Sequence, residues 1–74
     1  MPTLREKLGR AIRRLRTDAG YSQESFAHAC KLHRTYMGAV ERGETNISLD
    51  NLERIAHTLK LPVSRLFADA EQGR

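Results

Sequence analysis

The stretch SQESFAHACKLHRTYMGAVERG, residues 22–43, decides the fold of this 74-residue chain. Its residues favour two short helices, from about 23 to 30 and from about 34 to 41 or 42, separated by a three-residue turn. Ser22 stands where a helix N-cap is expected, and Gly43 stands where a left-handed residue ends a helix. The stretch therefore predicts a pair of short helices joined by a tight turn.

Helical periodicity continues on both sides of this pair. Apolar residues spaced by three or four predict a first helix from Leu4 to Asp18. A fourth helix is expected to start after a Ser48 cap and to run to about Leu59, and Pro62 ends it or starts a brief fifth helix. The expected inward-facing residues of the first and fourth helices are Leu4, Leu8, Ala11, Ile12, Leu15, Leu49, Leu52, Ile55, Ala56 and Leu59.

The chain reads as one all-α domain without strands, with a core over about residues 4–68 and a frayed polar tail at 69–74. So short a chain buries only a thin core, and self-association is the expected reinforcement. The candidate homodimer interface consists of Leu61, Val63, Leu66 and Phe67. The same four residues could instead close the core of a monomer.

The charge distribution favours a polyanionic partner. The chain has 13 lysines and arginines against 9 aspartates and glutamates, a formal net charge of +4. Residues 1–42 hold nine basic and four acidic groups, so the positive excess lies in the first half. The single cysteine, Cys30, predicts no internal disulfide and a cytoplasmic location. No membrane span, cofactor or metal site is expected.

The second helix of the central pair has one face without large apolar side chains. On a helical wheel, Tyr36, Met37, Val40 and Glu41 fall on the inward arc, and the opposite arc carries Arg34, Thr35, Gly38, Ala39 and Arg42. Small residues on that arc permit close approach to a DNA groove. Arg34 can donate two hydrogen bonds to a guanine, and Thr35 can contact a thymine methyl group. An ordinary solvated helix surface is the plainer alternative for both.

Polar residues around this helix are candidate phosphate contacts. Gln23 opens the preceding helix, where its amide and nearby backbone N–H groups can donate to a phosphate. The full candidate set is Ser22, Gln23, His33, Arg42, Thr45, Asn46 and Ser48. Loop and capping duties would also explain Thr45, Asn46 and Ser48.

Two charged residues are expected to have a structural role. Glu41 lies at the edge of the inward arc, and Arg16 lies on the flank of the apolar stripe of the first helix. We predict that they form a partly buried ion pair that fixes the first helix against the third.

Residues 22–27, His33-Arg34-Thr35-Tyr36-Met37 and Val40-Glu41-Arg42-Gly43 resemble the phage repressor and Cro (XRE) family of helix-turn-helix proteins. Within that family, the chain is most similar to restriction–modification controller proteins, on the basis of Arg34-Thr35-Tyr36 followed by Val40-Glu41-Arg42-Gly43 and Asn46-Ile47-Ser48-Leu49. The resemblance implies a five-helix lambda-repressor-like fold, a homodimer on a palindromic operator, phosphate contact at Gln23, base reading by Arg34, Thr35 and Tyr36, and the Arg16–Glu41 pair. Ala39, one turn further along the open arc of the same helix, is a further candidate for base reading. Lys31 and His33 depart from the family pattern, so either Lys31 is left-handed or the turn shifts by one residue.

The residues favour other functions less strongly. His28, His33 and His57 match no familiar zinc spacing, and no nucleophile motif is present, so we expect no enzyme and no catalytic residues. An antitoxin or a phage-type switch that also binds a protein partner is the main alternative. RNA binding is disfavoured because stacking aromatic residues are few. RNA polymerase is a further partner if the protein activates transcription.

Overall fold

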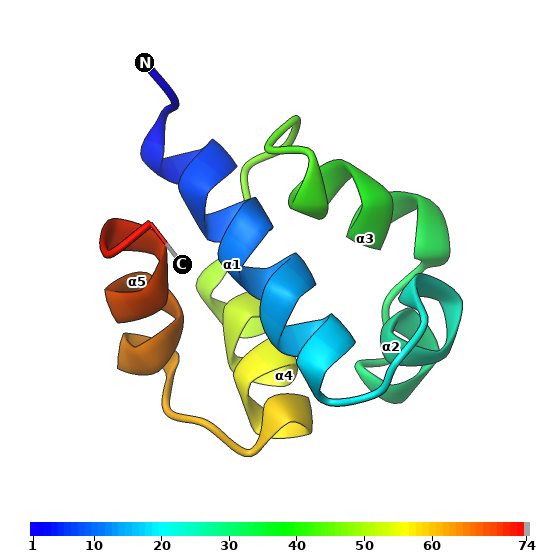
Figure 1. The fold of residues 1–74 in the computed structure, drawn as a ribbon. Helices are drawn as coiled ribbons and strands as arrows, with labels where there is room; N and C mark the ends of the chain where they lie inside the picture. Colours follow the sequence, from blue (N-terminus) through cyan, green and yellow to red (C-terminus); the bar gives the residue numbers. More distant parts are fainter. Residues whose placement is uncertain (74) are drawn as a thin grey trace.

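The computed structural model describes residues 1–73, which form five helices and no strand (Figure 1). The helices are α1 (Leu4–Asp18), α2 (Gln23–Ala29), α3 (Arg34–Glu41), α4 (Leu49–Leu59) and α5 (Val63–Glu71). The all-α, five-helix architecture expected from the sequence is confirmed. In this part of the chain, no helix is long and apolar enough to cross a membrane.

The core is shared among all five helices. The central α1 has α3 on one side and α5 on the other, while α2 packs against α3 and α4 against α5 (Figure 1). Each helix contributes one of the five largest fully buried side chains, which are Ile12, Phe26, Met37, Ile55 and Leu66. Burying a side chain of this kind stabilises a fold by about 1.5–3 kcal/mol. The packing of both α1 and α2 against α3 holds α3 in place.

Gly9 allows α1 and α3 to approach closely. A Cβ atom at this position would lie 2.6 Å from the backbone oxygen of Glu41, closer than real Cβ contacts allow. The glycine costs the helix about 1 kcal/mol of intrinsic stability relative to alanine. In return, the backbone of α1 lies directly against the last turn of α3.

The helix ends largely follow the residues that predicted them. Ser22 and Ser48 are the N-caps of α2 and α4, and their hydroxyl oxygens accept hydrogen bonds from backbone N–H groups three residues later. Gly43 follows α3 with a φ of 71°, a left-handed conformation that glycine adopts without strain. Both helices of the central pair therefore begin and end close to the expected residues.

Lys31 adopts the left-handed conformation after α2, with a φ of 61°. Its backbone N–H donates to the His28 oxygen at 3.0 Å, and that of Leu32 donates to the Ala27 oxygen at 2.8 Å. These are the two bonds of a Schellman motif, in which glycine is usual at the left-handed position. The turn is not shifted, and α3 begins at Arg34 as expected.

The expectation of a frayed polar tail over residues 69–74 is wrong for residues 69–71, and Arg74 lies outside the described residues. Helix α5 continues to Glu71, and both Asp69 and Ala70 are buried. Asp69 Oδ2 accepts a hydrogen bond from Arg14 Nη2 at 2.8 Å, and Oδ1 accepts one from Arg65 Nε at 3.0 Å. The packed part of the chain thus extends beyond the expected range of 4–68.

Candidate nucleic-acid interface

The leading end of α3 is exposed and well defined. Arg34 and Thr35 are both exposed, and Arg34 takes part in none of the four ion pairs recorded among residues 1–73. His33 is the N-cap of the helix, and its Nδ1 accepts a hydrogen bond from the Thr35 backbone N–H at 3.2 Å. A histidine thus performs the capping that serine or aspartate usually provides.

The rest of the expected open face is only partly open. Ala39 is partly exposed and Arg42 is exposed, but Gly38 is buried. A Cβ atom on Gly38 would lie 3.0 Å from Arg42 Nη1 and 3.4 Å from Gln23 Oε1. The assignment of Gly38 to the DNA-facing arc is therefore wrong, because α2 and the Arg42 side chain cover that flank of α3.

Arg16 and Glu41 are in direct contact behind this face. Arg16 Nε and Nη2 donate to the two carboxylate oxygens of Glu41 at 2.6 and 2.9 Å, and Arg16 Nη1 donates to the Tyr21 backbone oxygen at 3.0 Å. The two side chains are only 10% and 3% exposed. This two-pronged contact connects α1 to the last turn of α3, as the sequence predicted.

Gln23 joins the same network. Its Nε2 donates to Glu41 Oε1 at 3.1 Å, so one of its two amide hydrogens is already used within the protein. The side chain is partly buried at the start of α2. Among the hydrogen bonds recorded for residues 1–73, the Gln23 amide group donates only to Glu41, which leaves its second hydrogen free.

The other candidate phosphate contacts lie at helix ends and in the loop after α3. Ser22 and Ser48 are capping residues, which was the plainer interpretation for Ser48. Arg42 pairs with Glu44 at 3.0 Å, with both side chains 58% exposed, so this pair is weak. Of the two loop residues, Asn46 is exposed and Thr45 is partly buried.

Tyr36 lies between the core and the surface. It is partly buried and packs against the core, in agreement with its place on the inward arc. Asn51 Nδ2, from the first turn of α4, donates to the Tyr36 hydroxyl oxygen at 3.0 Å. Sequence reasoning missed Asn51, because no local pattern connects it to a residue 15 positions earlier.

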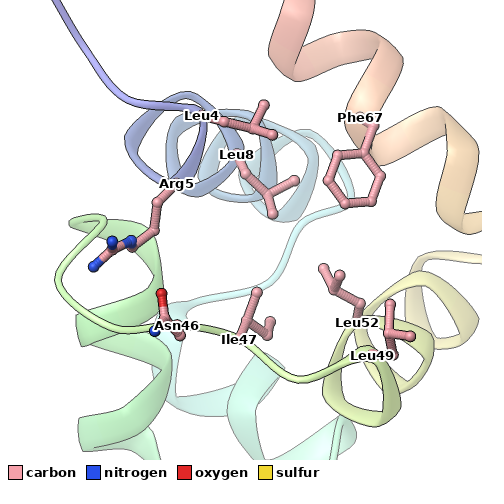
Figure 2. A pocket seen from close by; sticks show the side chains of 8 residues that line it. All are labelled: Leu4, Arg5, Leu8, Asn46, Ile47, Leu49, Leu52 and Phe67. Atoms are coloured by element: carbon pink, nitrogen blue, oxygen red, sulfur yellow. The ribbon is translucent and has the colours of Figure 1, made fainter.

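An apolar groove opens beside the loop that follows α3. It has a volume of about 360 Å³. Figure 2 shows its lining side chains converging from α1 and α5 on one side and from the loop and α4 on the other. They are Leu4, Arg5, Leu8, Asn46, Ile47, Leu49, Leu52 and Phe67.

Leu4 and Leu49 were expected to face inward, and the structure corrects this. Leu4 is 50% exposed and Leu49 is 74% exposed, because the fold of one chain leaves this groove uncovered. Leu66 was also expected at the homodimer interface. This expectation is wrong, because Leu66 is fully buried in the core and cannot contact a second copy. Leu61, Val63 and Phe67 are partly buried.

Comparison with known proteins agrees with this arrangement of helices. A sequence model described as helix-turn-helix matches residues 12–66, which is more than half of the chain. The chain belongs to the XRE-type helix-turn-helix family of DNA-binding regulators. Control protein C.MunI from a Mycoplasma species is 40% identical over 73 residues, covering 97% of this chain and 99% of that protein.

Two solved structures are similar to this chain in three dimensions. The restriction–modification controller protein C.AhdI from Aeromonas hydrophila superposes with a TM-score of 0.80 at 43% identity, over 82% of this chain and 92% of that one. The clp gene regulator ClgR from C. glutamicum gives a TM-score of 0.92 at 32% identity, over 97% and 92%. This XRE-type chain thus shares its fold with proteins whose names describe regulators.

Proposed function

We infer that this protein regulates transcription as a homodimer that reads a palindromic site on double-stranded DNA, and that it controls a restriction–modification system. The exposed leading end of α3, with Arg34 outside the recorded ion pairs, is the observation that carries this proposal. The proposed role in a restriction–modification system is supported by the similarity to control protein C.MunI, which extends over 99% of that protein.

Base reading is assigned to the first turns of α3. The planar guanidinium of Arg34 suits guanine O6 and N7, and Thr35 offers a methyl group and a hydroxyl to a neighbouring base. Ala39, one turn later, is small enough to let the helix enter the major groove. Tyr36 completes the set at the edge of this face.

Phosphate contacts hold the helix in register. Gln23 donates its second amide hydrogen, held in place by Glu41. Because His33 Nδ1 accepts a hydrogen bond, the neutral ring carries its hydrogen on Nε2, which can be donated outward. Ser22, Arg42, Thr45, Asn46 and Ser48 complete the proposed contacts to the two strands.

The dimer is proposed to form over the apolar groove. Two of the three exposed large apolar side chains of the described chain, Leu4 and Leu49, lie there together with Phe67. The groove also borders Asn46 in the loop after α3 (Figure 2). A second copy seated there would hide apolar surface and place two recognition helices along one side of the DNA. Leu61 and Val63, which the sequence also placed at the interface, do not line this groove.

Selection from random duplexes tests the DNA proposal, and Arg34→Ala then tests the mechanism. This substitution should weaken binding to the selected duplex by about 1–3 kcal/mol and leave a scrambled duplex almost unaffected. Arg10→Ala is the matched control, because Arg10 is an exposed arginine beside Ala70 on the α5 side of the molecule. An equal loss on both duplexes, or no selected sequence, would contradict base reading.

Sedimentation at micromolar concentrations tests the dimer. The wild-type protein should sediment as a dimer, and Leu49→Lys should shift it to monomer without unfolding, because Leu49 is 74% exposed in one chain. Leu61→Lys is the control and should leave the dimer intact. Dissociation by Leu61→Lys alone would instead place the interface at the α4–α5 connection.

A further inference from the structure

Asn51 holds the hydroxyl group of Tyr36. Asn51 Nδ2 donates to Tyr36 Oη at 3.0 Å, across the space between α4 and α3. Asn51 is itself fixed, because its backbone N–H donates to Ser48 Oγ at 3.1 Å in the N-terminal cap of α4. The Tyr36 ring packs against the core. Both ends of the hydrogen bond are thus held by the fold.

The direction of this hydrogen bond decides what the hydroxyl can do next. A phenol has one hydrogen to donate and can accept hydrogen bonds on its oxygen. Asn51 supplies a donor, so it uses the accepting side of the oxygen and leaves the hydroxyl hydrogen. Among the hydrogen bonds recorded for residues 1–73, Tyr36 Oη appears only in the bond from Asn51.

The position of Tyr36 suggests where that hydrogen goes. Tyr36 directly follows Arg34 and Thr35, the exposed leading residues of α3, and it is partly exposed itself. A major groove presents acceptors at guanine O6 and N7, adenine N7 and thymine O4, and phosphates lie at its edges. A phenol whose oxygen is already occupied by a donor is well prepared to donate to such an acceptor.

We propose that Asn51 is a positioning residue for DNA recognition, which fixes the Tyr36 hydroxyl and leaves it as a hydrogen-bond donor to the DNA. This inference rests on the proposed function. Asn51 acts only through the Tyr36 oxygen and need not touch the DNA. The competing explanation is a purely structural tether between α3 and α4, which would affect stability but not the preference for one sequence.

A double-mutant cycle on the full chain separates the two explanations. Binding is measured for wild type, Asn51→Ala, Tyr36→Phe and the combined variant, on the selected duplex and on a scrambled one. Loss of one hydrogen bond predicts a drop of about 3- to 10-fold on the selected duplex for each single variant. The combined variant should bind like Tyr36→Phe alone, since Asn51 has no oxygen left to position.

Asn51→Asp tests the direction of the hydrogen bond at constant size. A carboxylate accepts rather than donates, so the Tyr36 hydroxyl should turn inward and operator affinity should fall. The added negative charge weakens binding to both duplexes, and the same variant in the Tyr36→Phe background measures that part. The proposal is supported only by a loss of affinity that is larger in the wild-type background than in Tyr36→Phe and larger on the selected duplex than on the scrambled one.

Thermal unfolding of each variant shows that it is folded under the binding conditions. The proposal is overturned if Asn51→Ala leaves operator binding unchanged, if it weakens both duplexes equally, or if its effect persists fully in Tyr36→Phe. A wild-type protein without any sequence preference would overturn the proposed function instead. The two failures are therefore distinguishable.

Discussion

Substituting one partner of the buried Arg16–Glu41 pair should lower the free energy of unfolding more than replacing both partners together. Glu41→Leu would leave the Arg16 guanidinium, which is 10% exposed, without its two carboxylate bonds. Removing one partner of a pair this deeply buried costs about 3–5 kcal/mol. A small domain has only about 5–15 kcal/mol of total stability, so either single substitution should remove a large part of it.

Urea unfolding of four proteins measures the effect: wild type, Arg16→Met, Glu41→Leu and the combined variant. The combined variant replaces the pair with apolar side chains of similar size and strands no charge. It should therefore be more stable than either single variant, with a coupling free energy of about 2–3 kcal/mol. A single variant too unstable to give a folded baseline counts as strongly destabilised, and recovery of folding in the combined variant remains the diagnostic result.

Two results would refute this reasoning. If Glu41→Leu cost less than about 1 kcal/mol, the carboxylate would be no more important than a surface ion pair. If the losses of the two single variants simply added in the combined variant, Arg16 and Glu41 would act independently.

Three further outcomes are expected. Gly9→Ala should destabilise the fold by about 1–3 kcal/mol in urea unfolding, because the added methyl group meets the α3 backbone, and a neutral effect would contradict the close approach. Lys31→Gly should stabilise it by up to about 1 kcal/mol by relieving the left-handed strain, whereas Lys31→Ala, which cannot relieve it, should give no such gain. Burial raises the pKa of the Cys30 thiol, so at pH 8 the thiol should react with a disulfide reagent only as fast as the protein opens, and rapid labelling of folded protein would be inconsistent with burial.

The sequence predicts the helices well because their signals are local. Apolar periodicity marks α1 and α4, and Ser22, Ser48 and Gly43 mark helix ends through bonds to residues only a few positions away. Those signals do not depend on the rest of the fold. The start of α3 at Arg34 was predictable for the same reason.

Burial of particular side chains is harder to predict, because it depends on distant residues. Asp69 looks like part of a polar tail until Arg14, 55 positions earlier, is seen to pair with it. Gly38 falls on the open arc of an isolated helix, but α2 supplies Gln23 to cover it. Leu49 belongs to the apolar stripe of α4, yet no element of one chain covers it.

In the candidate site, too, features of a single helix were predictable from the sequence, whereas contacts between helices were not. The exposure of Arg34 and Thr35 follows from the wheel of α3 alone, and the structure agrees with it. The bonds from Gln23 to Glu41 and from Asn51 to Tyr36 join different helices, and only the three-dimensional arrangement reveals them. The DNA contacts themselves remain predictions.

The even distribution of the core among the five helices limits how the protein can be divided. Because α1, α4 and α5 supply Ile12, Ile55 and Leu66 to the same interior that holds Phe26 and Met37, a peptide of α2 and α3 alone would lack most of its supporting surface. The recognition unit is therefore not transplantable as an excised fragment. Changes of sequence preference are better engineered by substituting surface residues of α3 within the intact chain.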